Sequence, residues 1–519
     1  MAIKTLIKKS EYHDSVTLML VARELTKFPG VIDVGVIMAT EANKALINEA
    51  GLLTPDCASA TPNDLVIAIS ANDGAADAAL LEAEKLLRQK RSLDDGAEFR
   101  PKTLRGAVKA NPKANVAVIS VAGRYAADEA RDALRRGLHV LLFSDNVSLE
   151  DEIALKTYAR DHGLLLMGPG AGTTILNGVA LGFANVVPSG PVGIVSAAGT
   201  GMQEVSTLLA KDGVGITQGI GTGGRDLKEE VGGIMMLEGL KALQADLATK
   251  VIALVSKPPS PGVAEAILDQ VAQSDKPTVI GFMGASPQTT SLRGGQRPTK
   301  QSEFAATLQE TALLAAKAAG AHINVAEVIA REEETLQIQA KELRATLKPE
   351  QKYLRGLFSG GTLCYEAQVI WRDRLKEPVL SNAPLKKENQ LTDSLHSVKH
   401  TCVDLGEEEF TVGRPHPMID NDLRIRRLLQ EARDPAVAVI MLDVVLGYGA
   451  HPDPASELGS AVRQAKQLAD RELIVVASVT GTEQDPQRLS TQVAALKASG
   501  AIVCDSNATA AKLVAMIVG

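Results

Sequence analysis

The chain has 519 residues, of which 45% are hydrophobic and 23% charged, an ordinary globular composition with material for about three to four domains. Its net charge of −7, without a basic stripe, disfavours a role on nucleic acid or on a membrane surface. No apolar run reaches the roughly 18 residues of a membrane span, no apolar leader opens the chain, and the four cysteines form no CxxC pair. We therefore expect a reduced, cytoplasmic protein without a metal site.

The first 105 residues predict an N-terminal α/β domain of the α+β type. Residues 3–38 indicate a strand, a helix and a second strand, and "NDLVIAIS" (63–70) indicates another strand. The run "AADAALLEAEKLLRQK" (75–90) predicts a helix. From Arg91 to Arg105 the chain is polar and interrupted by glycine and proline, which is typical of a linker.

The next segment, residues 106–187, alternates strands and helices and predicts a parallel sheet. Its expected strands are "NVAVISVAG" (115–123), "HVLLFSD" (139–145) and "LLLMGPG" (164–170).

Two longer segments, 188–330 and 351–519, share an order of five strands and indicate an internal duplication of a flavodoxin-like unit. The first set is "VGIVSA", "GITQGIG", "VIALVSKP", "PTVIGFMG" and "AHINV"; the second is "YLRGLFSG", "HTCVDLG", "VAVIMLDVV", "ELIVVASVT" and "AIVCDS". Their ends also look alike, "KAAGAHINVAEVIA" (317–330) against "KASGAIVCDSNATA" (497–510). Between them, residues 331–350 predict a charged linker helix that ends at Pro349.

One motif occurs in both units: a strand, a turn of small and hydroxyl residues, and a helix. It reads "GIVSAAGTGMQE" (193–204) in the first unit and "GLFSGGTLCYE" (356–366) in the second. Free backbone N–H groups and the helix dipole favour an anion at such a turn, although a tight turn needs glycine and a capping hydroxyl in any case. Because the motif occurs twice, we expect phosphate-binding residues at Ser196, Gly199, Thr200, Ser359, Gly360, Gly361 and Thr362.

Further candidates lie at strand ends and in loops. In "GIGTGGRDL" (219–227) and "GRPHPMID" (413–420), arginines are placed to clamp an anion and a histidine to carry a proton, with a purely structural turn as the alternative. Lys257 follows a buried strand and either meets an anionic substrate or is simply solvated in its loop. Asp443 lies inside an apolar strand and is either aimed at a site or buried with a partner. The predicted catalytic residues are Arg225, Arg414 and His416, and the predicted binding residues are Gly223, Gly224, Asp226, Lys257, Asp420 and Asp443.

These motifs carry a family resemblance. Residues 106–330 resemble the α subunit of succinyl-CoA synthetase, and 351–519 resemble a ligase-type domain of the same superfamily, the NDP-forming acyl-CoA synthetases. With "YHDSV", "FSDNVSLEDE", "VSKPP", "SGGTL" and "GRPHPMID", the whole chain resembles the FdrA family. The resemblance implies an N-terminal α+β domain (1–105), a Rossmann-like CoA-binding-type domain (106–187), and two flavodoxin-like domains (188–330 and 351–519) joined by a linker helix (331–350).

Several departures from this family bear on mechanism. Succinyl-CoA synthetases carry a phosphorylated histidine in a loop that reads "GASPQTTSLRGGQRP" (284–298) here, and the chain has no histidine between His162 and His322. Lys257 stands near the place of the glutamate that supports the phosphohistidine. The glycine-rich CoA loop near the N-terminus is absent, and the loop written GPDCGT in FdrA relatives reads "GPGAGT", with Gly170 and Ala171.

The resemblance therefore implies a group-transfer subunit that acts on an acyl or carbamoyl phosphate without a phosphohistidine. The expected type is an oxamate or oxalurate carbamoyltransferase of ureide nitrogen metabolism, with a small anionic substrate, partner subunits and a homo-oligomeric state. Two alternatives stay open. One is an acyl-CoA synthetase that uses CoA and a nucleotide, and the other is a non-catalytic, metabolite-binding scaffold.

Overall fold

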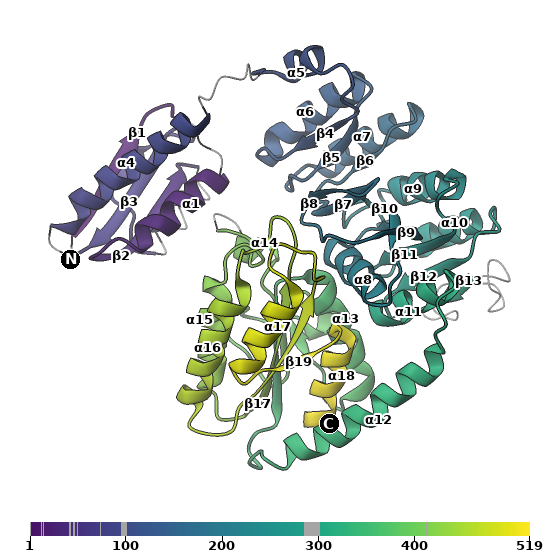
Figure 1. Cartoon of the computed structure of the whole chain (residues 1–519). Coiled ribbons are helices and arrows are strands. Elements are labelled where there is room, and N and C mark those ends of the chain that lie inside the picture. Colours follow the sequence, from purple (N-terminus) through teal and green to yellow (C-terminus); the bar gives the residue numbers. More distant parts are fainter. Residues whose placement is uncertain are drawn as a thin grey trace. The chain divides into compact units, whose positions relative to one another are not determined.

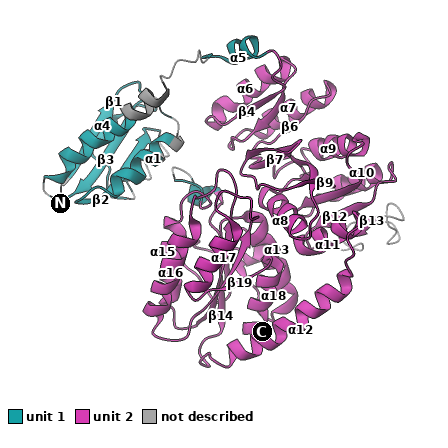
Figure 2. Cartoon of the chain, in the orientation of Figure 1, with its two compact units in different colours: residues 1–111, 408–416 teal, residues 112–407, 417–519 magenta. Residues whose placement is uncertain are grey.

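The computed structural model describes residues 2–11, 13, 15–40, 43–44, 47–48, 50–72, 74–94, 101–284, 302–411 and 414–519. The chain divides into two compact units (Figure 2). The first contains residues 1–111 and 408–416, and the second contains residues 112–407 and 417–519.

The first unit is built on an antiparallel sheet of order β1-β3-β2 (Ala2–Lys8, Leu65–Ala71, Val31–Met38). Helices α1 (Ser15–Thr26) and α4 (Ala75–Asp94) supply the apolar side chains for one face. A smaller core that includes α3 (Pro55–Ser59) covers the other face. Alternate residues of β3 serve the two cores, since Ile67 and Ile69 belong to the first and Val66 and Ala68 to the second. The expected α+β domain is confirmed, and α4 continues to Asp94, into the segment predicted as a linker; α5 (Leu104–Ala110) follows.

The second unit begins with the parallel sheet β4-β5-β6 (Val116–Ile119, His139–Leu142, Leu166–Met167), as the sequence predicted. Helices α6 (Gly123–Arg135) and α7 (Leu149–Asp161) connect its strands. A hairpin that was not predicted follows, formed by β7 (Thr173–Leu176) and β8 (Val179–Gly182). It pairs antiparallel with β10 and so extends the next sheet rather than this one.

That next sheet has, among the described residues, the order β13-β12-β11-β9-β10-β7-β8. Its parallel strands are β9 (Ser189–Ser196), β10 (Ile216–Gly221), β11 (Val251–Ser256), β12 (Thr278–Phe282) and β13 (Ser302–Phe304). The intervening helices are α8 (Gly199–Lys211), α9 (Ile234–Ala245) and α10 (Pro261–Val271), and α11 (Leu308–Ala318) follows β13.

The last sheet has the order β15-β16-β14-β17-β18-β19. Its strands are β14 (Tyr353–Phe358), β15 (Leu380–Ser381), β16 (Thr401–Asp404), β17 (Val437–Val445), β18 (Ile474–Thr480) and β19 (Ile502–Cys504). The helices are α13 (Gly361–Arg374), α15 (Asp422–Ala432), α16 (Pro454–Ala469), α17 (Leu489–Ala498) and α18 (Asn507–Val518), with α14 (Glu408–Thr411) assigned to the first unit. A short 3-10 turn lies at Lys387–Asn389.

Apart from the β7–β8 hairpin and the two-residue edge strand β15, the two large sheets share the flavodoxin strand order, second-first-third-fourth-fifth, and confirm the predicted pair of flavodoxin-like sheets. One prediction is wrong: "AHINV" (321–325) is not a strand, and the fifth strand of the first sheet is β13. The matched ends proposed from the sequence were therefore out of register. In the structure β13 and α11 correspond to β19 and α18.

One apolar core joins the two large sheets. It takes side chains from α8 and α11 on the first sheet and from α13 and α18 on the second, including the buried Trp371. The long helix α12 (Val325–Arg344) connects the sheets and lies along α18 (Figure 1), where Glu332 pairs with Lys512 at 2.7 Å. It covers most of the segment predicted as a linker helix and ends before Pro349.

Candidate functional site

The two glycine-rich turns of the duplicated sheets lie against each other. In each sheet the turn joins the first strand of the repeat to its helix, β9 to α8 and β14 to α13. A Cβ atom on Gly360 would lie 3.0 Å from Thr200, and one on Gly201 would lie 2.8 Å from the Cγ2 atom of Thr362. Neither helix has a side-chain N-cap among the described residues. The free N–H groups and partial positive charges of two helix N-termini therefore meet at one place.

Two equivalent glutamates hold these helices in a reciprocal arrangement. Glu204, on α8, accepts a hydrogen bond from the backbone N–H of Asn507 at 2.9 Å, at the start of α18 in the other sheet, and one from the hydroxyl of Thr480. Glu366, on α13, accepts one from the backbone N–H of Leu308 at 2.6 Å, at the start of α11 in the first sheet, and one from the Asn507 side chain at 2.8 Å. Each repeat thus caps the last helix of the other.

The turn after β14 is already occupied by a carboxylate of the protein itself. Asp443, on β17, accepts hydrogen bonds from the backbone N–H of Ser359 at 2.7 Å, from that of Gly360 at 2.8 Å, and from the Ser359 hydroxyl at 3.0 Å. Arg424 pairs with the same carboxylate at 3.1 Å, and both side chains are buried. The prediction that Asp443 is buried with a partner is confirmed. The N–H groups of Ser359 and Gly360, predicted to bind substrate, are used internally.

The turn after β9 is organised differently. Ser196 is buried, its hydroxyl donates to the carbonyl of Ala198 at 2.7 Å, and it accepts from the N–H of that residue at 3.0 Å. A Cβ on Gly199 would lie 3.3 Å from the hydroxyl of Thr173, on the β7 hairpin. No carboxylate is recorded on this turn in the part of the chain that the structure describes. The N–H groups just before α8 are used as well, since Ala197 donates to the carbonyl of Val255 at 3.2 Å and Ala198 to Ser196. The two turns therefore differ in charge, because the carboxylate of Asp443 lies at the turn before α13.

A buried aspartate missing from the sequence prediction lies at the N-terminus of α13. Asp404, the last residue of β16, is 2% exposed, and a Cβ on Gly361 would lie 2.5 Å from its Oδ2 atom. Its Oδ1 atom accepts from the N–H of Gly406 at 2.9 Å. Burial, followed by the charge of Glu407, raises the pKa of Asp404 to about 7, and Lys257 opposes the shift. An aspartate that ends an apolar strand beside a glycine-rich turn was the available signal.

Lys257 brings a positive charge to this place from the other repeat. It follows β11, and its Nζ atom lies 5.5 Å from the ring centroid of Tyr365, on α13. Its charge also acts on the buried thiol of Cys364, whose pKa burial raises. The predicted binding residues Lys257, Gly361 and Thr362 are thus brought together with Thr200. Their role in binding stays a prediction.

Arg225 and Asp226 belong to a second polar group, in the loop after β10, which begins beside the turn after β9 with a hydrogen bond from the Thr222 N–H to the carbonyl of Ser196 at 2.8 Å. Arg225 pairs with Glu152 at 2.7 Å and donates to the carbonyl of Val147 at 2.7 Å. Asp226 is fully buried and pairs with Lys156 at 2.8 Å, and it also accepts from two backbone N–H groups of α9. Lys156 in turn pairs with Glu152 at 2.8 Å. These partners fasten α7 to the loop after β10, so the charges predicted to clamp a substrate have structural partners.

The glycines before this pair differ in their surroundings. Gly223 has a φ of +86°, and a Cβ there would lie 2.6 Å from the carbonyl of Pro169, in the "GPGAGT" loop. Gly224 is exposed. Gly223 therefore allows two loops to approach closely.

The remaining predicted residues lie on the segment 414–420. Arg414 and His416 belong to the first unit, where the Arg414 N–H donates to the carbonyl of Thr411 at 3.2 Å. Asp420 accepts from the N–H of Asp422 at 2.8 Å. The catalytic roles predicted for Arg414 and His416 stay predictions. The segment 284–298 stands where succinyl-CoA synthetases carry the phosphohistidine loop. Apart from Gly284, it lies outside the described residues.

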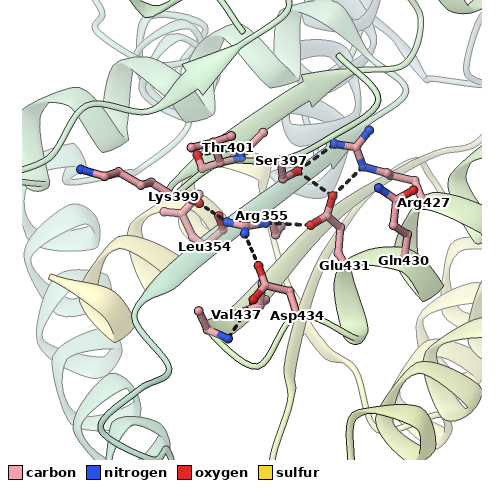
Figure 3. A network of polar contacts seen from close by, with 12 residues as sticks. Leu354, Arg355, Ser397, Lys399, Thr401, Arg427, Gln430, Glu431, Asp434 and Val437 are labelled. Carbon is pink, nitrogen blue, oxygen red and sulfur yellow. Dashed lines mark hydrogen bonds and ion pairs between the residues drawn. The ribbon is translucent and has the colours of Figure 1, made fainter. Parts of the chain in front are cut away.

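A charged network at the opposite, amino end of β14 was also missed. Arg355 is 1% exposed and pairs with Glu431 at 2.8 Å and Asp434 at 2.8 Å, while Arg427 pairs with Glu431 at 2.6 Å (Figure 3). Carbonyl groups of the loop before β16, including that of Lys399, accept from the same guanidinium groups. Every charge here has a partner, so the network fastens α15 to the sheet.

In the described ranges, no group of three or more His, Cys, Asp or Glu side chains is placed to hold a metal ion. None of the helices in the same ranges is long and apolar enough to cross a bilayer.

Comparison with known proteins places the chain in a family. YahF of Escherichia coli K12, described as uncharacterized, is 43% identical over 511 residues, which cover 98% of this chain and 97% of YahF. The chain belongs to the FdrA family, with YahF. Family models match three parts of this FdrA protein: the AllF heavy metal-associated domain at 1–101, the CoA binding domain at 189–284, and CoA-ligase at 357–517.

More distant relatives are CoA ligases. The α subunit of an ADP-forming succinate–CoA ligase from Staphylococcus epidermidis (ATCC 12228) is 29% identical over 188 residues, 35% of this chain. The FdrA protein spans 60% of that relative's length. The resemblance to the succinyl-CoA synthetase α subunit is thus confirmed.

Among solved structures, PH0766 of Pyrococcus horikoshii OT3 is 14% identical with a TM-score of 0.31, over 82% of this chain and 87% of that one. The apo form of a dinucleotide-forming acetyl-coenzyme A synthetase 1 from Ca. Korarchaeum cryptofilum is 16% identical with a TM-score of 0.30, over 84% and 92%. Because both TM-scores are this low, the fold assignment rests on the sheets described above and not on these structures.

Proposed function

We propose that this FdrA protein is a group-transfer enzyme of the CoA-ligase type, which moves an acyl group between phosphate and the thiol of CoA. One observation carries the proposal: the N-termini of α8 and α13 meet at one place, and they lie in the segments that match the CoA binding domain and CoA-ligase. Two helix N-termini of this kind attract the phosphate group of an acyl phosphate.

The chain's own residues divide the work of binding. The first N–H groups of α8 take the phosphate oxygens, because the carboxylate of Asp443 at the turn before α13 makes that helix N-terminus less favourable for a second anion. Lys257 offsets the phosphate charge, and Thr200 and Thr362 add hydroxyl donors. Positioning and charge stabilisation of this kind suffice for a substrate that is already activated.

The reaction proposed here does not require a phosphohistidine. The thiol sulfur attacks the acyl carbon, the S–H proton leaves to a base, and phosphate departs with the electron pair of the broken C–O bond. A relay from a nucleotide would need a nucleophilic ring nitrogen. Because the chain has no histidine between His162 and His322, we propose the half-reaction between acyl phosphate and CoA rather than a complete nucleotide-driven ligation.

A second candidate is carbamoyl transfer, from carbamoyl phosphate to an amide such as oxamate, within a complex with partner subunits. The absence of a histidine between His162 and His322 favours carbamoyl transfer, because carbamoyl phosphate is also an activated substrate and needs no phosphoryl relay. The same helix N-termini would hold its phosphate. It ranks second because the matched family models and relatives are CoA proteins.

Incubation of the purified protein with acetyl phosphate, with and without CoA, separates these functions when thioester and phosphate are both measured. We expect phosphate release that depends on CoA, with one thioester formed per phosphate. Turnover of carbamoyl phosphate with oxamate, and none with CoA, would select the second candidate. If both substrates stay intact while calorimetry still detects binding of carbamoyl phosphate or CoA, the protein is a scaffold and the proposal is wrong.

A further inference from the structure

Asp404 is a buried carboxylic acid beside the first residue of α13. We propose that Asp404 is the proton acceptor of this site, the group that takes the proton from the nucleophile as it attacks the acyl phosphate. This inference rests on the proposed function and deepens it.

The position of Asp404 is fixed by its backbone. Its N–H donates to the side-chain oxygen of Asn382 at 2.9 Å, and its carbonyl accepts from the side-chain N–H of the same residue at 2.9 Å. Because these two bonds hold the backbone of Asp404, its side chain starts from a fixed position at the end of β16. Its Oδ2 atom reaches the first residue of α13, where Gly361 leaves room for it. The carboxyl group is thus held at the N-terminus of α13, which lies against the N-terminus of α8 to which we assign the phosphate.

The buried carboxylates of Asp443, Glu204 and Glu366 each accept more hydrogen bonds than that of Asp404. Asp443 accepts three hydrogen bonds from the turn and pairs with Arg424. Each oxygen of Glu204 and Glu366 accepts a bond that caps a helix or reaches a neighbouring side chain. Within the described part of the chain, by contrast, the side chain of Asp404 accepts one hydrogen bond, from Gly406. A base needs a free lone pair, and Asp404 has one.

The charges that face Asp404 come from every element around it. Glu407 lies on the loop after β16, Asp443 on β17, Lys257 after β11 and Cys364 on α13. Burial comes first and raises the pKa of Asp404 to about 7, with Glu407 and Asp443 adding to the rise and Lys257 opposing it. A carboxyl group that exchanges its proton near neutral pH is suited to general base catalysis.

The step balances. The nucleophile's S–H bond breaks and its proton moves to an oxygen of Asp404, while the sulfur forms a bond to the acyl carbon. The C–O bond to phosphate breaks, and phosphate leaves with the electron pair. Asp404 then returns the proton to the departing phosphate or to water. In carbamoyl transfer, the proton would come from the amide nitrogen instead.

The test compares D404N with E407Q in CoA-dependent phosphate release from acetyl phosphate. Because a positioned base contributes about 100-fold or more, D404N should lower kcat by that factor with little change in KM. Glu407 raises the pKa of Asp404, so E407Q should keep the maximal rate and move the rising limb of the pH–rate profile to lower pH. D404E, which restores a carboxylate, should recover part of the rate.

Infrared difference spectra between acid and alkaline pH, wild type minus D404N, measure the Asp404 carboxyl directly and do not need turnover. We expect its titration near pH 7. Wild-type rate and pH profile in D404N, or titration of Asp404 at the ordinary value for an aspartate, would overturn the inference while the proposed function stood. Absence of turnover in the wild type with both acyl phosphates would overturn both.

Discussion

At the scale of single residues, the site depends on an aspartate inside an apolar strand. Asp443 neutralises the buried Arg424 and satisfies the N–H groups of the turn before α13. A carboxylate of the protein thereby lies at one of the two turns, whereas at the other turn the N–H groups of Ala197 and Ala198 donate to neutral oxygens. Duplication alone would have produced two identical sites, and Asp443 makes them different.

Replacement of Asp443 by asparagine should destabilise the protein by about 3–5 kcal/mol, because the guanidinium of Arg424 stays buried without its counter-charge. Urea unfolding measures the loss as a shift of the midpoint. The matched control is D373N, which removes an exposed partner of Arg372 and should cost about 1 kcal/mol or less. Equal effects of the two substitutions would show that Asp443 does not hold this turn.

Gly361 offers a second residue-scale prediction. A Cβ at this position would lie 2.5 Å from the carboxylate of Asp404, so G361A should displace Asp404 or the first turn of α13. We expect a loss of about 1–3 kcal/mol in the free energy of unfolding. G224A is the control, since the nearest atom to its Cβ would be 3.9 Å away, and it should change stability by about 0.5 kcal/mol or less. A fully stable G361A protein would contradict the position given to Asp404.

The sequence indicated which turns matter but not how their residues are used. Both glycine-rich turns are recognisable because strand, turn and helix are adjacent in the chain. The partners of Asp443, Arg225 and Asp226 come from elements far away in the sequence, and no local pattern announces them. Asp404 ends an apolar strand, which was a local signal, but its meaning depends on Gly361 and Lys257, which are far away in the sequence.

At the scale of elements, reciprocal capping by Glu204 and Glu366 aligns α8 and α13 across the two sheets. Burial raises the pKa of Glu366 to about 7, the hydrogen bonds from Asn507 and Leu308 oppose the shift, and the charge of Glu204 adds to it. The folded protein therefore binds this proton more tightly than the unfolded chain does, whose glutamates titrate near 4.5.

The stability contributed by Glu366 is consequently complete below about pH 4.5 and is lost as the pH rises through about 7. The loss should be on the order of 3 kcal/mol. Urea unfolding at several pH values, in wild type and E366Q, measures it as the difference between the two curves. That difference removes the opposite contributions of His139 and His400, whose pKa values burial lowers. Parallel curves would mean that Glu366 keeps its charge in the folded protein.

The sequence predicted most strands correctly, because the buried parallel strands are continuous apolar runs between turn signals. It failed at the fifth strand of the first repeat. That strand is the three-residue edge segment Ser302–Phe304, which carries little apolar pattern. The run chosen instead, "AHINV", is apolar because Ile323 and Val325 pack on the shared core beside the start of α12.

At the scale of the whole molecule, two flavodoxin-like sheets in one chain bury a shared core and bring their first helices together. Placing both repeats in one polypeptide fixes the two helix N-termini against each other. The sequence indicated this duplication, but the contact between the two turns follows only from the packing of α8, α11, α13 and α18.

The central claim is that an acyl phosphate is held where these N-termini meet, with Lys257 offsetting its charge. The most direct measurement is the rate of CoA-dependent phosphate release from acetyl phosphate in wild type, K257M and the exposed control K228M. We predict release in the wild type, an unchanged rate in K228M, and a rate about 100-fold lower in K257M. Release that is equal in all three proteins, or absent from the wild type, would contradict the claim.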